Sequence, residues 1–266
     1  MARTESPGSL ARAAFRSVVD LQDQRRGLGA PVRDIFYRRV VDGDPAFPLA
    51  SLMNSRSGPG GGRGGRTRVL LYLSLLWVAG GGDHSTHRPA RFWAELLGIP
   101  DAEGAGSRTI RNTWRELAVR GFVEETPGDH GGDPPTIRPL REDGSREAYS
   151  IPTGEDGDTY RRIPEAAWKQ LFHDSDLTGA GLAMYLIALR TSGQARGRAM
   201  VFPRAQFKAQ YGLGESTRKA GLRNLADDLL VLESDQDRTD GRGDRGGRRR
   251  VRNTYTLSPT FADPRT

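Results

Sequence analysis

The side chains best suited to chemistry in this sequence are arginines and small polar residues at helical spacing. Around residues 108–115 they fall on one side of a predicted helix, whose other side carries Ile110, Trp114 and Leu117. Arg donates paired hydrogen bonds to guanine or phosphate, and Asn pairs with adenine in the same way. This face therefore offers hydrogen-bonded recognition of a polyanion. Its predicted contact residues are Arg108, Thr109, Arg111, Asn112 and Arg115.

The same chemistry recurs 108 positions later along the chain. Residues 216–233 (STRKAGLRNLADDLLVLE) align without a gap with residues 108–125 (RTIRNTWRELAVRGFVEE). Helical spacing places Ala220 and Asn224 on the outward face of this second helix. Arg218 falls on an inward position, a misfit that would be removed if the side chain snorkelled or the helix began one residue later. The predicted contact residues are Ser216, Thr217, Arg218, Lys219 and Arg223.

These two helices must be positioned by the elements around them. In each copy a short helix ending at Gly98 or Gly212 precedes the contact helix. We expect Ser107 to cap the first contact helix, and Glu215 or Ser216 to cap the second. An apolar strand follows at 122–125 or 230–234, then a polar loop, then a second strand at 148–152 or 254–258. The predicted order is therefore helix, helix, helix, strand, loop, strand, twice.

The two polar loops differ in charge. Between residues 238 and 252 the second copy carries seven Arg against two Asp, whereas the loop of the first copy is longer and nearly neutral. An arginine hairpin flanked by glycine suits contact with phosphate or insertion into a minor groove. We therefore expect the second copy to hold DNA more strongly. The predicted contacts in its loop are Arg242, Arg245, Arg248, Arg249, Arg250 and Arg252.

The repeat defines the predicted fold, an α+β and mostly α chain of two tandem winged-helix domains behind a basic N-terminal extension. The extension with its Gly-rich linker covers residues 1–65, the first domain 66–155 and the second 156–262. Within the extension, helical spacing predicts a helix over 9–26 and a short helix after Pro48.

Over residues 66–262 the chain resembles bacterial proteins with two successive winged-helix domains, which include plasmid replication initiators and some transcription regulators. In such initiators one domain often supports dimerisation while the other grips the major groove. The resemblance implies that the second domain is the main binder, through Arg218, Lys219, Arg223 and the loop arginines. Condensin-associated subunits also pair two winged helices and bind protein partners, but the basic second loop favours DNA.

Composition limits the alternatives. The 266 residues carry a net charge of +7 and no cysteine, which excludes disulfides, thiolate zinc sites and thiol catalysis. No apolar run reaches the length of about 18 residues that suggests a membrane span, so we expect a cytoplasmic, nucleoid-associated protein. The stretch 60–67 resembles a P-loop but has Arg66 where Lys is required, and His84 with His87 lacks further zinc ligands. We predict no catalytic residue, no metal, no cofactor and no enzyme activity.

The predicted function is sequence-specific binding of double-stranded DNA in the regulation of transcription, by a monomer or a homodimer. Two alternatives stay open. One is a replication initiator or partition protein of a plasmid or other mobile element, which uses the same contacts at an origin. The other is an adaptor whose winged helices bind a partner protein.

Overall fold

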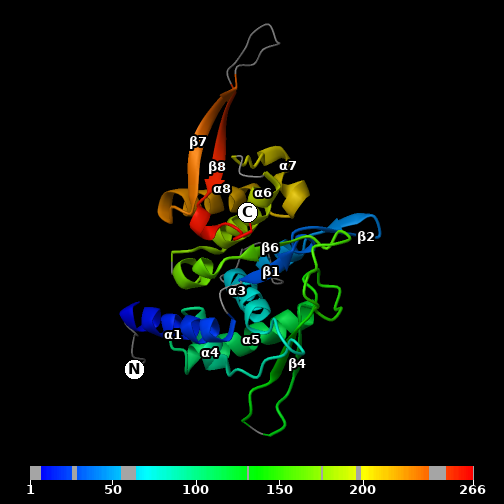
Figure 1. Ribbon diagram of the computed structural model, residues 1–266, viewed down its shortest axis with the longest axis vertical. Helices are drawn as coiled ribbons and strands as arrows, with labels where there is room; N and C mark the ends of the chain where they lie inside the picture. Colours follow the sequence, from blue (N-terminus) through cyan, green and yellow to red (C-terminus); the bar gives the residue numbers. More distant parts are fainter. Residues whose placement is uncertain are drawn as a thin grey trace.

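The computed structural model describes residues 7–25, 29–54, 64–130, 132–174, 176–195, 199–239 and 250–265. About half of these residues are helical, and the strands among them form small antiparallel sheets of two strands each (Figure 1). The chain is therefore of the α+β class. The α-helices are α1 (Pro7–Arg25), α2 (Pro48–Met53), α3 (Gly64–Val78), α4 (Ala90–Leu96), α5 (Ala105–Arg120), α6 (Gly179–Ala195), α7 (Arg204–Tyr211) and α8 (Glu215–Arg223).

The strands pair in chain order with one exception, because β1 pairs with the distant β6. They are β1 (Ala30–Arg33), β2 (Arg39–Val41), β3 (Asp44–Ala46), β4 (Val123–Thr126), β5 (Thr136–Pro139), β6 (Tyr160–Ile163), β7 (Leu232–Thr239) and β8 (Arg250–Leu257). The short helical turns are the 3₁₀ turns η1 (Asp34–Phe36) and η4 (Pro259–Phe261) and the π-helical turns η2 (Ala167–Leu171) and η3 (Asn224–Asp228).

One order of elements occurs twice. The first unit, residues 64–139, runs α3, α4, α5, β4, β5, and the second unit, residues 179–257, runs α6, α7, α8, η3, β7, β8. In each unit, one residue of the loop between the first two helices forms an isolated β-bridge with the last strand. These bridges join Thr86 to Ile137 and Met200 to Tyr255. The hairpin of β7 and β8 projects from one end of the long axis of the molecule, and that of β4 and β5 from the other (Figure 1).

The second strand of the first hairpin lies earlier than predicted. Residues 136–139 form β5, in which Ile137 is buried and pairs with Glu125. Residues 148–152, predicted as this strand, contribute only an isolated bridge between Ala148 and Leu140. The prediction was wrong because residues 148–152 were assigned by their alignment with 254–258, whereas Ile137 supplies the apolar residue that the hairpin needs against the core.

The two copies also differ by one residue that the sequence alignment hides. Leu117 and Leu225 are equivalent, but Phe122 donates its backbone N–H to Leu117, whereas Val231 donates to Leu225. The ungapped alignment is therefore wrong after residue 225. The extra residue lies in η3, where the wider π-helical turn accommodates it.

This insertion places Leu230 where the first unit has Gly121. Both residues have left-handed backbones, with φ of 52° and 82°, and the Leu230 side chain is 75% exposed. A left-handed backbone costs an L-residue other than glycine about 1–2 kcal/mol. We expect Leu230→Gly to raise the free energy of unfolding by about 0.5–1 kcal/mol, after allowing for the greater entropy of unfolded glycine. Urea denaturation tests this, and a lower stability of the variant would contradict it.

The segment predicted as an N-terminal extension forms part of the core. Helix α1 packs on α4, and Val32, Phe36 and Leu52 are buried. Arg68 and Arg120 donate hydrogen bonds to carbonyl groups at the C-terminal end of α2, which satisfies acceptors that a helix leaves free.

The two units share one continuous core. Trp77 of α3 stacks on Trp168 of η2 with ring centroids 4.1 Å apart, and Trp168 donates its indole N–H to Ser74. Phe47 lies so close to Gly212 that a Cβ atom at position 212 would come within 2.6 Å of its ring. Buried residues of α3, η2 and the segment 30–54 belong to one hydrophobic core. This shared core holds the two units in a fixed relation.

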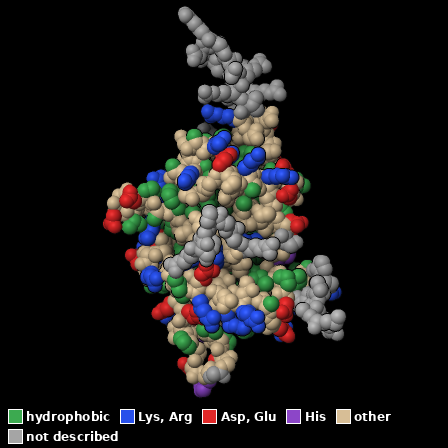
Figure 2. Space-filling model, turned by 180° about the vertical axis from the view of Figure 1, so that it is seen from behind, with side chains coloured by type: hydrophobic (Ala, Val, Ile, Leu, Met, Phe, Trp, Pro, Cys, Tyr) green, Lys and Arg blue, Asp and Glu red, His purple; other side chains and the backbone are tan. Residues whose placement is uncertain are grey.

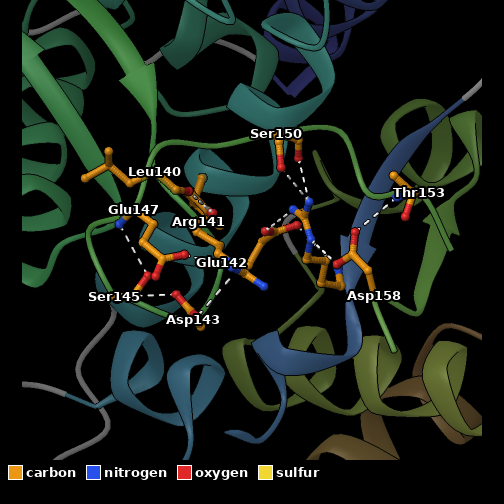
Figure 3. Close-up of polar contacts among 11 residues, drawn as sticks. Leu140, Arg141, Glu142, Asp143, Ser145, Glu147, Ser150, Thr153 and Asp158 are labelled. Carbon is orange, nitrogen blue, oxygen red and sulfur yellow. Dashed lines mark hydrogen bonds and ion pairs between the residues drawn. The ribbon is translucent and has the colours of Figure 1, made fainter. Parts of the chain in front are cut away.

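A buried ion-pair cluster ties the N-terminal segment to the chain that joins the units. Glu142, Ser150 and Asp158 converge on one guanidinium, that of Arg33 in β1 (Figure 3). The Arg33 Nη1 atom lies 2.7 Å from the Glu142 carboxylate, and neither side chain is more than 3% exposed. Burial lowers the pKa of Arg33, but Glu142 and Asp158 outweigh it and raise the pKa. Burial also raises the pKa of Glu142, against the lowering effect of Arg33, so two carboxylates of different exposure face the one guanidinium.

Candidate nucleic-acid interface

The second unit contains a groove between α8 and the hairpin of β7 and β8, with the first turn of α7 along one side. Five cationic side chains and two carboxylates line it, so the groove carries an excess of positive charge. Figure 2 shows several Lys and Arg side chains, with a few Asp and Glu among them, on the upper part of one face. The charged lining residues are Arg204, Arg218, Lys219, Arg223, Arg252, Glu215 and Asp227.

Three of the predicted contact residues lie in this groove as exposed cations without an ion pair to another described residue. Lys219, Arg223 and Arg252 are exposed, and they come from α8 and from β8, which are far apart in sequence. Ser216 is exposed and Thr217 half-buried on the first turn of α8. The groove thus brings together contacts that the sequence predicted separately for the helix and for the loop.

Arg218 lies in the same groove but is already bonded. Its Nε and Nη2 atoms donate to the two Glu215 carboxylate oxygens at 2.8 and 2.7 Å, and Nη1 donates to the Phe202 carbonyl at 3.0 Å. These hydrogen bonds lower the pKa of Glu215 and raise that of Arg218, so both groups are charged. Helix α8 begins at Glu215 after Gly214, and Glu215 therefore pairs with Arg218 instead of acting as the predicted N-cap.

Asn224 does not face outward as predicted. It is 3% exposed, its Oδ1 accepts hydrogen bonds from the backbone and side chain of Thr178, and its Nδ2 donates to Asp176 and Asp228. The prediction assumed 100° per residue, but Asn224 begins the π-helical turn η3, in which the rotation per residue is smaller. Asn224 is therefore a structural residue that fixes the end of α8 on the start of α6.

Loss of these bonds is expected to destabilise the second unit. In Asn224→Ala the Thr178 N–H, which is part-buried, loses its acceptor and the buried amide loses its other hydrogen bonds, which we expect to lower the free energy of unfolding by about 1–3 kcal/mol. Asn112→Ala, which removes an exposed asparagine from α5, is the matched control and should change stability by less than about 0.5 kcal/mol. Thermal or urea unfolding distinguishes the two, and equal stabilities would contradict the structural role.

In the first unit the predicted face is exposed as expected. Helix α5 buries Ile110, Trp114 and Leu117, and its other side carries polar residues, of which Arg115 donates to Asn112 at 3.4 Å. The predicted residues on the exposed side are Arg108, Thr109, Arg111, Asn112 and Arg115.

The N-terminus of α5 is capped differently from the prediction. The Asp101 carboxylate accepts the backbone N–H groups of Gly104 and Ala105, whereas Ser107 lies inside the helix, buried, and donates to the Ala102 carbonyl. The prediction of Ser107 as N-cap was wrong because the helix begins earlier, at Ala105. The earlier start adds Ala105 and Gly106 ahead of the predicted contacts.

The hairpin of the first unit weakens the positive charge of its face. Glu124 and Glu125 lie on β4, and the one cation of β5, Arg138, forms ion pairs with Asp83 and Glu124. Burial raises the pKa of Glu125, against the lowering effect of Arg115. The face of α5 is therefore flanked by carboxylates, while the groove of α8 combines five cations, Arg252 among them, with the two carboxylates of Glu215 and Asp227.

The loop arginines are described only at their C-terminal end. Arg242, Arg245, Arg248 and Arg249 lie outside the described residues. Arg250 begins β8, and Arg252 is exposed on the same strand.

Arg204 and Asn253 are among the polar groove residues that the sequence analysis did not identify. Arg204 begins α7, and Asn253 lies on β8 beside Arg252. The available signal was Pro203, since proline favours a helix start and would have placed Arg204 at the exposed end of the short helix. Asn253 has no such signal, because its position depends on the pairing register of β7 and β8.

None of the helices in the described residues combines the length and apolar character that crossing a membrane requires. No family model, curated protein or solved structure matches the chain.

Proposed function

We propose that the chain binds double-stranded DNA through two winged-helix units and regulates transcription. The observation that carries this proposal is the groove in which Lys219 and Arg223 of α8 stand beside Arg252 of the hairpin. A helix of this kind fits the major groove of B-DNA, and cations on the adjacent hairpin meet the phosphate backbone. Occupancy of a site near a promoter would then block or recruit polymerase.

The two units differ in their proposed roles. The second unit supplies most of the affinity, because its exposed cations surround a groove with few carboxylates. The first unit presents Arg108, Asn112 and Arg115 beside an acidic hairpin, which suits selection between bases better than attraction to phosphate. The shared core holds the two units in a fixed relation. A duplex or partner bound by one unit therefore limits the positions in which the other unit can bind.

The salt dependence of binding tests the proposal. A protein that makes about six phosphate contacts loses about 10³-fold in affinity between 50 and 200 mM salt. We expect this loss for the full chain on labelled genomic duplexes, measured by fluorescence anisotropy. Absence of binding at 50 mM salt would reject DNA binding and leave the protein-adaptor alternative.

A further inference from the structure

The pair of Glu215 and Arg218 is the one feature of the groove that simple charge attraction does not explain. Arg218 is only 18% exposed, and its guanidinium is held on one edge by Glu215 and on Nη1 by the Phe202 carbonyl. Exposed arginines normally sample many rotamers, and this one is fixed by three hydrogen bonds to two residues, Glu215 and Phe202. Fixing a side chain in this way prepares it for a partner of defined geometry.

The remaining donors of Arg218 define that partner. A guanidinium has five N–H groups, and the three hydrogen bonds leave one on Nη1 and one on Nη2. These N–H groups on Nη1 and Nη2 are donors of the kind that pair with the O6 and N7 acceptors of guanine in the major groove. Arg218 is also the fourth residue of α8, within the N-terminal part of the helix, from which base contacts are made in major-groove recognition.

Charge argues for a base instead of a phosphate. The Glu215 carboxylate neutralises Arg218 and would itself face any phosphate that approached, which is unfavourable. The edge of a base pair carries no net charge, so it accepts the remaining N–H groups without this repulsion. Lys219 and Arg223 lie beside the pair in the same groove and are available for phosphate contact.

We propose that Arg218 reads the guanine of a G·C pair in the major groove and that Glu215 positions it for this contact. This inference rests on the proposed DNA binding of the second unit. The preferred sites of the chain should therefore contain one G·C pair facing the start of α8.

Selection of preferred sequences from a random duplex library, using the full chain, tests the inference. For the wild type we expect about a tenfold preference for G·C at one position, since a bidentate contact discriminates by that order. Arg218→Lys keeps the charge but loses the fork, and should abolish this preference with little change in the slope of log affinity against log salt. Lys208→Ala, which removes an exposed cation of α7 outside the groove, should keep the preference.

Glu215→Gln separates positioning from simple folding effects. Without the carboxylate, Arg218 is no longer neutralised, so the salt slope should steepen by about one unit while the G·C preference falls. Retention of the preference in Arg218→Lys would overturn the inference. So would an Arg218→Ala variant that loses affinity equally for all duplexes and about one unit of slope, because this result identifies a phosphate contact. Salt-dependent binding of the wild type would stand in both cases, whereas its absence would reject the proposed function.

Discussion

Replacement of Lys219, Arg223 and Arg252 by alanine is expected to lower the affinity for duplex DNA about 100-fold at 150 mM salt. Each phosphate contact contributes about 0.9 to the slope of log affinity against log salt, so three lost contacts reduce the slope by about 2.7. The same linear relation gives the 100-fold loss of affinity at 150 mM salt. It also predicts that the affinities of the variant and the wild type become equal near 1 M salt. Anisotropy titrations at four or five salt concentrations measure both quantities.

A matched variant removes the same charge elsewhere. Arg12, Arg16 and Arg38 are exposed, lie outside the groove and come from α1 and the turn after η1. Their joint replacement by alanine lowers the net charge equally, and we expect a much smaller loss of affinity and slope. Equal losses in the two triple variants would mean that net charge alone attracts DNA and that the groove is not the contact surface.

The second large effect concerns stability. In Glu142→Ala the buried Arg33 guanidinium loses its fully buried counterion, and Asp158, which is more exposed, compensates for only part of it. Breaking one side of a buried pair typically costs about 3–5 kcal/mol, and we expect a loss near the lower end of this range in the free energy of unfolding. Urea denaturation monitored by tryptophan fluorescence measures it.

The exposed pair of Arg141 and Glu147 in the same loop supplies the control. Its atoms also lie 2.7 Å apart, but Glu147 is 62% exposed, and Glu147→Ala should cost less than about 1 kcal/mol (Figure 3). The double variant Arg33→Met with Glu142→Leu should recover most of the stability, since apolar residues can replace a buried pair without loss. Similar losses for Glu142→Ala and Glu147→Ala would contradict the role of burial.

Helical spacing in the sequence was enough to predict the buried side of α5 and the exposed contacts opposite it. Ile110, Trp114 and Leu117 repeat with the helical period, and this period alone determines which side faces the core. The α+β class and the helices at α1 and α2 followed from the same kind of pattern.

The errors arose where tertiary structure changed the local period or supplied a partner. Asn224 is buried because η3 has a π-helical turn, which one extra residue creates and which the ungapped alignment could not reveal. The burial of Val32 depends on a strand that lies about 130 residues further along the chain, and β1 is buried along its whole length, so it shows no alternation of apolar and polar residues. Arg218, which the sequence placed at an inward position, lines the groove with a side chain only 18% exposed, and its pairing with Glu215 depends on the actual start of α8.

The pairing of β1 with β6 has a consequence for synthesis of the chain. Ala30 finds its partner Ile163 only after the whole first unit has been made. At a translation rate of about 5–20 residues per second, the N-terminal strand waits for roughly 7–26 s. During this time Val32 and Phe36, both buried in the finished molecule, have no strand β6 to cover them. A nascent chain is therefore most exposed to chaperones and proteases at its N-terminal end, and closure of β1 on β6 marks the end of that period.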